Sequence, residues 1–236
     1  MTDRTWAWLV LILAVAFAVS PLFSDGFNGF TKDQFPVVLD HWPAQPAGWA
    51  FSIWGVIYLW LIIGLGYGVW RRADDPDWQP ARPALALSLA VGVPWIAVAN
   101  MAPIATTVMI LIMAAAAIAA MLRAGRHDPL LQAQPIGLYA GWLTAASGVA
   151  LAVTLSGHAV LSPQPAALIL LALVLAVALI MQARRPDVWS YPLAVGWAAL
   201  GIVAANFRAD YWPVAALAAL GIVALAWRYF SGKDMT

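Results

Sequence analysis

The sequence predicts an all-α protein that spans a membrane as a bundle of about eight transmembrane helices. Of its 236 residues, 64% are apolar and only 10% are charged, whereas a soluble domain carries roughly 45–50% apolar and about 25% charged residues. The apolar residues gather in stretches of roughly twenty, the length that crosses a bilayer as a helix. No charged side chain lies deep inside any stretch. Composition and patterning therefore exclude an ordinary soluble domain.

Eight apolar stretches are predicted as spans, and a proline opens most of them. Proline is favoured in the first turn of a helix because its missing N–H would have no partner there. The predicted spans are residues 5–23, 48–70, 83–101, 103–122, 135–156, 164–182, 191–207 and 211–230. The prolines that begin the last six spans are Pro83, Pro103, Pro135, Pro165, Pro192 and Pro213.

Two spans carry small residues at helical spacing. These residues are Gly64 and Gly68 on the second span, and Gly141, Ala145 and Gly148 on the fifth. Small residues let two helices approach closely within a membrane. We expect both sets to pack against other helices of the same chain, and the alternative is a dimer contact.

Basic residues predict the orientation of the bundle, because cytoplasmic loops of membrane proteins carry an excess of Lys and Arg. With the N-terminus placed in the cytoplasm, the basic residues of the cytoplasmic segments are Arg4, Arg71, Arg72, Arg82, Arg123, Arg126, Arg184, Arg185, Arg228 and Lys233. The opposite side holds only Lys32 and Arg208. The sequence thus predicts an integral protein of the bacterial inner membrane with both termini in the cytoplasm.

The sequence lacks the groups on which most membrane catalysis and ion coupling depend. It has no cysteine, and its eleven acidic residues are all Asp, which excludes thiolate chemistry and iron–sulfur sites. His41, His127 and His158 lie in or beside loops, so a haem or metal ligand at mid-depth is not expected. The net charge of +1 implies no attraction to nucleic acid. The sequence therefore predicts neither a metal site nor catalytic residues, and it argues against an enzyme.

The start of the second span is the most distinctive segment, because it places aromatic side chains on one helical face. Phe51, Trp54 and Tyr58 are spaced i, i+3 and i+7. Trp54 and Tyr58 lie deeper than an interfacial belt, where lipid cannot bond to an indole N–H or a phenol O–H. They must face a packed protein core or an aromatic ligand pocket, and composition leaves these alternatives equal. Further candidates with polar tips are Trp95 and Asn100 on the third span, and Tyr139 and Trp142 on the fifth.

One connection, residues 24–47, is much longer than the others. Its aromatic residues are Phe27, Phe30, Phe35 and Trp42, and it ends in a proline-containing run. Exposing these rings to water would cost about 25 cal/mol per Å². A loop of this length in a compact membrane domain is usually a lid or lies on the bilayer surface. We expect it to cover the outer mouth of the bundle.

The run from Trp42 to Trp70 resembles the first loop and second helix of the TspO/MBR family, the tryptophan-rich sensory proteins related to the mitochondrial translocator protein. The residues that follow this family's order of aromatic side chains are Trp49, Phe51, Trp54 and Tyr58. The element Tyr139-x-x-Trp142-x-x-Ala145 is similar to one in the family's fifth helix, and Trp95 stands for its third-helix tryptophan. The resemblance covers residues 1–157, which it implies are a five-helix bundle, and leaves residues 158–236 as three additional helices.

The resemblance implies an outer-facing pocket that binds porphyrins, sterol-like molecules or other aromatic lipophiles. We expect this pocket between the second, third and fifth spans, beneath the long first loop. The predicted ligand-binding residues are Trp42, Pro43, Pro46, Trp49, Phe51, Trp54, Tyr58, Trp95, Asn100, Tyr139 and Trp142. No cofactor is required by these residues, and a tetrapyrrole, a carotenoid or a lipid is the group that such a pocket would hold.

Three classes of function remain open. The aromatic face, the long loop and the resemblance favour an integral membrane binding or sensor protein for a large lipophilic aromatic ligand. The alternative is a structural or accessory subunit of a larger membrane complex, which makes helix–helix and pigment or lipid contacts. An enzyme or transporter acting on lipophiles is the third class, and the lack of an acid–base pair within the spans disfavours it. Expected partners are membrane lipids, a lipophilic small molecule, and a second copy or a larger membrane complex, with no nucleic acid.

Overall fold

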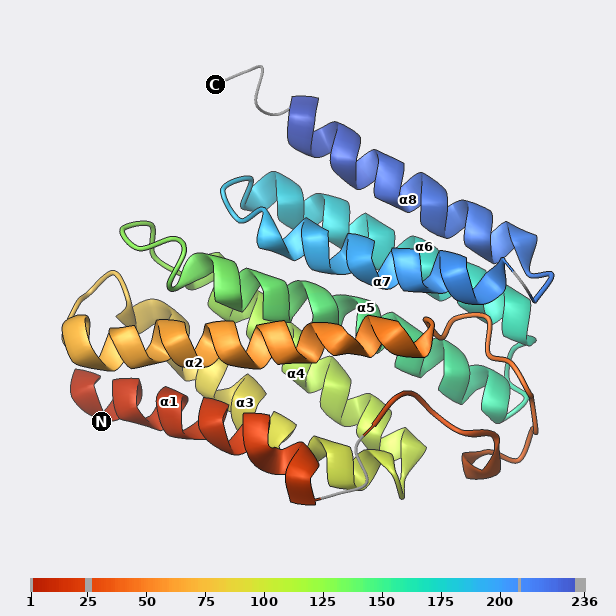
Figure 1. Cartoon of the computed structure of the whole chain (residues 1–236), viewed down its shortest axis with the longest axis horizontal. Helices are drawn as coiled ribbons and strands as arrows, with labels where there is room; N and C mark the ends of the chain where they lie inside the picture. Colours follow the sequence, from red (N-terminus) through yellow and green to blue (C-terminus); the bar gives the residue numbers. More distant parts are fainter. Residues whose placement is uncertain (1, 24–26, 208, 232–236) are drawn as a thin grey trace.

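The computed structural model describes residues 2–23, 27–207 and 209–231, and over these ranges it is a helical bundle without a strand (Figure 1). The α-helices are α1 (Asp3–Val19), α2 (Ile53–Arg71), α3 (Arg82–Ala99), α4 (Pro103–Arg123), α5 (Ala133–Gly157), α6 (Pro163–Arg184), α7 (Ser190–Asn206) and α8 (Trp212–Ser231). Successive helices run in opposite directions along one axis. The start of α1 and the end of α8 therefore both lie toward the left of Figure 1. The predicted all-α membrane fold is confirmed.

Seven of the described helices, with the short turns that extend them, are long and apolar enough to cross a membrane. The exception is α7, which has 17 residues. At 1.5 Å per residue it is about 26 Å long, slightly less than the roughly 30 Å hydrocarbon core of a bilayer. The predicted seventh span, residues 191–207, is therefore present as a helix of this integral membrane protein, but unlike α1 it is not lengthened by an adjoining turn.

The helix starts follow the prolines, and one predicted start needs correction. Pro103 and Pro163 are the first residues of α4 and α6, where a missing N–H costs no hydrogen bond. The second span, predicted as one helix from residue 48, begins instead as a 3₁₀ turn over Gly48–Ser52. This turn is tied to α7, because the Trp197 indole N–H donates to the Ala50 carbonyl oxygen at 2.8 Å. The bond holds the entrance of α2 against another helix.

The central helix is α5, which has 83% of its most apolar stretch buried. In Figure 1 it lies between α2 and α4 on one side and α6 and α7 on the other. Glycines make this close approach feasible: a Cβ on Gly141 would lie 2.3 Å from the Tyr191 carbonyl oxygen of α7. A Cβ on Gly148 would lie 2.3 Å from Cγ2 of Val174 in α6. The small residues of the fifth span thus pack within the chain.

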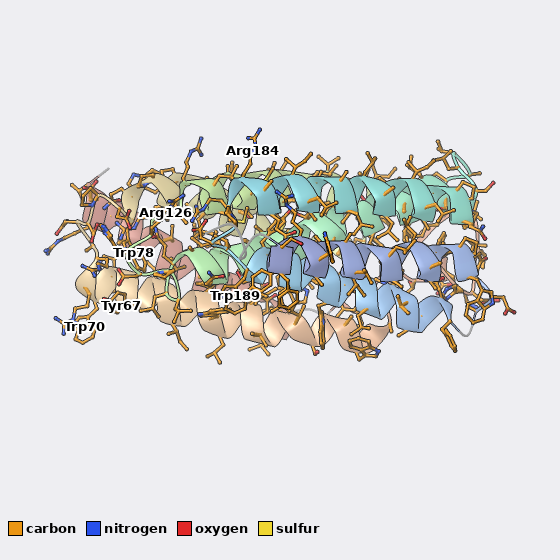
Figure 2. The ribbon with its side chains drawn as sticks, turned by 90° about the horizontal axis from the view of Figure 1, so that it is seen from above. Tyr67, Trp70, Trp78, Arg126, Arg184 and Trp189 are labelled. Atoms are coloured by element: carbon orange, nitrogen blue, oxygen red, sulfur yellow. The ribbon has the colours of Figure 1, made fainter. Side chains whose placement is uncertain are left out.

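A polar clamp closes the end of the bundle at which α2 ends and α3 begins. The Asp128 carboxylate accepts hydrogen bonds from Arg72 Nε at 2.7 Å and from Trp78 Nε1 at 3.0 Å. The Arg72 guanidinium lowers the pKa of the Asp128 carboxyl. Gly68 makes room for the Trp78 ring, because a Cβ there would lie 2.7 Å from it. Figure 2 shows this end in its left half, where the labelled residues are Tyr67, Trp70, Trp78, Arg126, Arg184 and Trp189.

Replacing Gly141 with alanine is expected to destabilise the bundle, because the new Cβ would collide with the Tyr191 carbonyl oxygen. We expect a loss of about 1–3 kcal/mol, measured as a lower midpoint of unfolding in mixed detergent micelles. Gly196→Ala is the matched control, since a Cβ at Gly196 has nothing within 4 Å. That variant should keep or raise the midpoint, because alanine favours a helix over glycine. Equal midpoints for the two variants would contradict the packing role of Gly141.

Candidate functional site

An aromatic cavity lies inside the bundle, where α2, α3, α4, α5 and α7 meet the described part of the long connection, the 27–47 segment. Its lining residues are Phe27, Gly29, Phe30, Gln45, Pro46, Phe51, Trp54, Trp95, Ile110, Trp142, Ala145, Ala146, Val149, Ala150 and Ala198. The helices form its walls, and the 27–47 segment forms its roof. Among the predicted ligand-binding residues, the structure brings together Pro46, Phe51, Trp54, Trp95 and Trp142.

The aromatic rings of the wall hold one another in edge-to-face contacts. The Trp142 ring lies 6.1 Å from the Trp54 ring and 5.8 Å from the Phe51 ring, at interplanar angles of 83° and 84°. This geometry is favoured because the positive edge of one ring meets the negative face of the other. Trp54 also stacks on Tyr58 at 5.3 Å. The contacts fix the ring orientations where α2 faces α5.

Phe17 of α1 supports this wall from behind, and sequence reasoning missed it. Its side chain is buried, and its ring lies 5.5 Å from Trp54, 5.2 Å from Tyr58 and 6.1 Å from Tyr139. A single phenylalanine in an apolar span carries no signal that separates it from residues facing lipid. The gathering of four rings therefore became visible only in the tertiary structure.

Three tryptophans line the cavity, and the two that are buried, Trp95 and Trp142, differ in the partners of their indole N–H groups. Trp95 Nε1 donates to the backbone carbonyl oxygen of Thr106 at 3.2 Å. The Trp142 side chain is 2% exposed, and its Nε1 has no hydrogen-bond acceptor among the described residues. A buried donor without an acceptor is costly in apolar surroundings. The cavity wall thus contains one hydrogen-bond donor that the protein itself leaves unused.

The 27–47 segment closes the cavity with phenylalanine rings and a glutamine clasp. The Phe27 ring lies 4.9 Å from the Trp95 ring and 6.2 Å from the Phe51 ring. The Phe30 N–H donates to Gln45 Oε1 at 2.9 Å, and Gln45 Nε2 donates to the Phe30 carbonyl oxygen at 3.4 Å. Together these contacts hold the roof over the aromatic wall.

The cavity is small while this roof is in place. Its free volume is about 30 Å³, whereas an apolar cavity that binds benzene has about 150 Å³. The Phe27 ring fills the space beside Trp95 and Phe51 that a planar molecule would need. A large ligand can enter only after the roof has moved.

Three predicted residues lie outside the cavity lining: Tyr58, whose ring stacks on Trp54 at 5.3 Å, Tyr139 and Trp49. Tyr139 is fully buried, and its hydroxyl lies 2.9 Å from Ser88 Oγ, so it is a packed core residue beside Tyr58. Trp49 is 45% exposed and packs edge-on against Trp197 at 5.0 Å. Its position at the outside of the bundle fits an interfacial aromatic residue.

The remaining predicted residues lie in or near the roof. The Trp42 ring is buried against Phe35 at 5.3 Å. The Pro43 carbonyl oxygen accepts a hydrogen bond from Asn206 Nδ2 at 2.8 Å, which ties the roof to the end of α7. Asn100 caps the C-terminal end of α3 and is exposed. These residues hold the roof and the helix ends and do not line the aromatic cavity.

A polar hollow of about 380 Å³ lies on the outer side of the roof. It shares Phe30, Gln45 and Pro46 with the aromatic cavity, so these residues separate the two spaces. His41 Nε2 lies 3.2 Å from Asn206 Oδ1 at its edge. Over the described part of the chain, no group of three or more His, Cys, Asp or Glu side chains could hold a metal ion.

The comparison with protein families gives one result. The sequence model of the family described as TSPO-like protein matches residues 4–229, which extends from the start of α1 through most of α8. No curated protein and no solved structure matches the chain.

Replacing Phe27 with alanine is expected to open the cavity and strengthen the binding of protoporphyrin. The parent must break the ring contacts of Phe27 with Trp95 and Phe51 before a ligand can enter, and each such contact is worth about 0.5–1.5 kcal/mol. We therefore expect about tenfold tighter binding, measured by quenching of tryptophan fluorescence. Phe207→Ala is the control, because that ring is exposed outside the cavity. Unchanged or weaker binding by Phe27→Ala would show that Phe27 does not occlude the site.

Proposed function

Because the chain belongs to the family of TSPO-like proteins, we propose that this integral membrane protein binds a large lipophilic aromatic ligand in its aromatic cavity. The ligand classes considered are tetrapyrroles, carotenoids and other isoprenoids, and sterol-like molecules. The family assignment agrees with the resemblance found in the sequence. The ligand itself is inferred from the chemistry of the cavity.

The unused indole N–H of Trp142 is the observation that carries this proposal. It lies in the wall of a cavity whose other described lining is almost entirely aromatic and aliphatic. Water is scarce at membrane depth, so a donor that the protein leaves unpaired is best explained by an acceptor that arrives with a ligand. The aromatic rings supply the rest of the binding surface, since planar ligands stack on indole and phenyl faces.

The roof is the part of the structure that is suited to open. Besides its buried apolar side chains, it is joined to the helices by single hydrogen bonds, such as Gln34 Nε2 to the Ala99 carbonyl oxygen at 2.8 Å and the Val37 N–H to the Gly157 carbonyl oxygen at 3.0 Å. Each such bond contributes only about 0.5–1.5 kcal/mol net. The helical walls are closely packed, so movement of the roof is the easier route for a ligand.

The second candidate function is an accessory subunit of a larger membrane complex, and one surface feature favours it. An apolar groove of about 480 Å³ runs between α7 and α8 on the outside of the bundle. Its aromatic lining residues are Trp189, Trp197, Tyr229 and Phe230. A groove of this kind could receive a helix of another subunit. If the protein purifies in mild detergent as a single chain with no other subunit bound to it, this result would count against the accessory-subunit alternative.

We further propose that both termini are cytoplasmic and that the protein lies in a bacterial inner membrane. The basic residues of the sequence concentrate at the end of the bundle that holds the Arg72–Asp128 clamp. Two of the basic residues on which the predicted orientation rests, Arg208 and Lys233, lie outside the described residues. Residues 24–26 of the long loop also lie outside them. A reporter active only in the cytoplasm should give signal when fused after residue 236. The same reporter inserted within residues 36–40 should give none, and the reverse pattern would overturn the orientation.

Two substitutions test the aromatic cavity directly. Trp54→Leu removes a ring of the wall, so protoporphyrin binding should weaken roughly three- to tenfold or more. Trp142→Phe keeps an aromatic ring but removes the unused N–H, and the lost hydrogen bond should weaken binding about fivefold. Both effects are measured by fluorescence titration of the full chain in nanodiscs.

Trp227→Leu is the matched control for these variants, because Trp227 is 75% exposed on α8. Its affinity for protoporphyrin should equal that of the parent. If Trp54→Leu and Trp142→Phe fold and bind like the parent, the cavity is not the binding site and the accessory-subunit alternative gains support.

A further inference from the structure

Two open hollows on the outside of the bundle meet at the end of the roof. One is the polar hollow of about 380 Å³ described above. The other, which we call the outer groove, has a volume of about 510 Å³ and follows the lipid-facing side of α7. Ala47 lines both, and the consecutive residues Ala204 and Ala205 of α7 line the groove and the hollow respectively. Because both are open at the surface, one molecule can lie across them without a passage through the protein.

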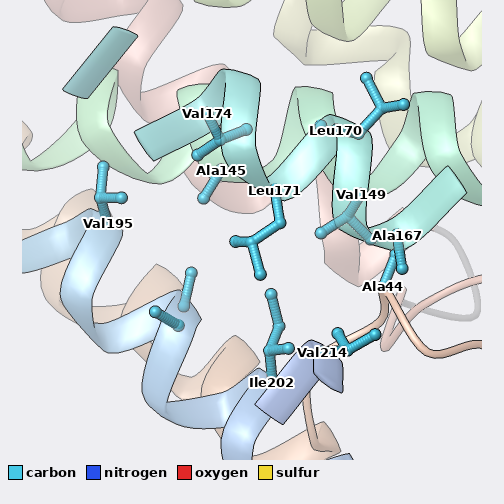
Figure 3. Close-up of a pocket in the computed structure, with 13 residues that line it drawn as sticks. Ala44, Ala145, Val149, Ala167, Leu170, Leu171, Val174, Val195, Ile202 and Val214 are labelled. Atoms are coloured by element: carbon cyan, nitrogen blue, oxygen red, sulfur yellow. The ribbon is translucent and has the colours of Figure 1, made fainter. Parts of the chain in front are cut away.

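The outer groove belongs to the face of α7 that does not pack into the bundle. On the inner face, Ile202 points toward Leu171 of α6 (Figure 3). The void between them has about 20 Å³, which is no larger than about one water molecule. Leu200, on the other face, is 46% exposed and lines both the outer groove and the groove between α7 and α8. Apolar surface therefore continues along α7 from the roof toward the other end of the bundle.

The polar hollow offers one cation and one anion. Lys32 Nζ lies 3.2 Å from Asp40 Oδ1, and both side chains are at least half exposed. His41 is already engaged, because its Nε2 lies 3.2 Å from Asn206 Oδ1 and its ring stacks on that of Tyr211 at 5.5 Å. With His41 neutral, the described lining carries one positive and one negative charge and therefore no net charge.

We propose that the polar hollow and the outer groove together bind one phospholipid with a phosphoethanolamine headgroup. The phosphate of the headgroup pairs with Lys32, and its ammonium group donates to the Asp40 carboxylate. An acyl chain lies along α7 over Leu200, Val203 and Ala204. The site lies outside the aromatic cavity, so it does not depend on the proposed ligand-binding function.

The charges of the hollow favour this headgroup over other phospholipid headgroups. An exposed ion pair such as Lys32–Asp40 contributes little stability, so a zwitterion can replace it with two ion pairs at low cost. Phosphoethanolamine has no net charge, like the described lining, and its N–H groups can donate to Asp40. A phosphoglycerol headgroup brings a negative charge without a cation for Asp40, and a phosphocholine headgroup has no N–H to donate.

The outer groove favours an acyl chain as the other part of the molecule. Its described lining residues are all apolar, and one of them is Trp49, which is 45% exposed as an interfacial tryptophan is. At 1.5 Å per residue, α7 extends about 17 Å from Ala204 to Leu193, which is about the depth of one leaflet. A helix of another subunit would cover the groove and leave the polar hollow empty. An amphipathic molecule matches both.

Native mass spectrometry of the delipidated full chain in mild detergent measures this binding directly. Dissociation constants are determined for three lipids that have the same acyl chains and carry phosphoethanolamine, phosphocholine or phosphoglycerol headgroups. The parent is expected to bind the phosphoethanolamine lipid about threefold more tightly than the other two, because it gains one more exposed ion pair. Equal constants for the three lipids would overturn the inference.

Two charge substitutions separate the two headgroup contacts. Asp40→Asn removes the partner of the ammonium group, so the preference for phosphoethanolamine over phosphocholine should disappear while phosphocholine binding stays unchanged. Lys32→Met removes the partner of the phosphate, so both lipids should bind about threefold more weakly with their ratio kept. Asp33→Asn is the matched control, since Asp33 is exposed on the same segment but does not line the hollow. A ratio that responds equally to Asp33→Asn and Asp40→Asn would contradict the headgroup site.

A second pair of variants tests the acyl part of the site. Ala204→Phe fills part of the outer groove, so all three lipids should bind about threefold more weakly or worse, through lost contacts of the chain. Ala219→Phe is the matched control, because Ala219 is exposed on α8 and lines neither the hollow nor the groove. Equal effects of the two variants would show that the groove holds no particular chain.

Photolabelling of the parent in nanodiscs gives a readout that needs no variant. A phosphoethanolamine lipid with a diazirine in its acyl chain is irradiated, and peptide mass spectrometry locates the label. Labelling should be enriched at Leu200 and Val203 over Leu173, which is exposed on the outer face of α6, and excess unlabelled phosphoethanolamine lipid should reduce labelling only in the groove. Uniform labelling that does not respond to the competitor would overturn the inference.

The outcomes also separate a lipid from a protein occupant. A second copy of the chain or another subunit that protects Leu200 and Val203 from the label, with no lipid retained in the native mass spectrum, would show that the groove is a protein interface. Protoporphyrin titration tests the aromatic cavity independently. Loss of either result leaves the other intact.

Discussion

The structure depends on one packing constraint: α5 lies at the centre of the bundle and is covered by other helices along nearly its whole length. Four glycines of this helix face neighbours so closely that a methyl group would overlap them. They are Gly137 against Val188, Gly141 against Tyr191, Gly148 against Val174 and Gly157 against Phe35. Because lipid and protein interior are similarly apolar, helix association in a membrane relies on such close contact and on hydrogen bonds. The position of α5 therefore sets where the other helices lie.

Hydrogen bonds between side chains on α5 and its neighbours complete this packing. The Thr144 hydroxyl lies 3.0 Å from the Tyr191 hydroxyl of α7, and the Tyr139 hydroxyl lies 2.9 Å from Ser88 Oγ of α3. Each polar atom at membrane depth needs such a partner. Among the described residues, four buried side-chain polar atoms have no partner, and the indole N–H of Trp142 is the one on α5. It lies where α5 faces the aromatic cavity, which is why this unpaired donor directs attention to a ligand.

The roof connects the two halves of the bundle over the site. Its start contacts the aromatic wall through Phe27, and its end is bonded to α7 through the Ala47 N–H and the Gly201 carbonyl oxygen at 3.0 Å. The family match runs through α6, α7 and most of α8 as well as the first five helices. The C-terminal helices thus take part in holding the roof and in lining the region beside the aromatic cavity. A division of the chain at residue 157 remains a prediction.

The sequence alone determined the helical membrane fold, the places where the helices begin, the family, and the aromatic character of the start of α2. Hydropathy, proline placement and the spacing of Phe51, Trp54 and Tyr58 are local properties, so they can be read from one chain. Only the tertiary structure decided which aromatic residues share a cavity. It separated Trp54 and Trp142, which line the cavity, from Tyr139, which is core, and it added Phe17 and Gln45. The reason is physical: rotation of each helix about its axis is set by long-range packing of small residues, and no local pattern records that rotation in a chain that is apolar on nearly every face.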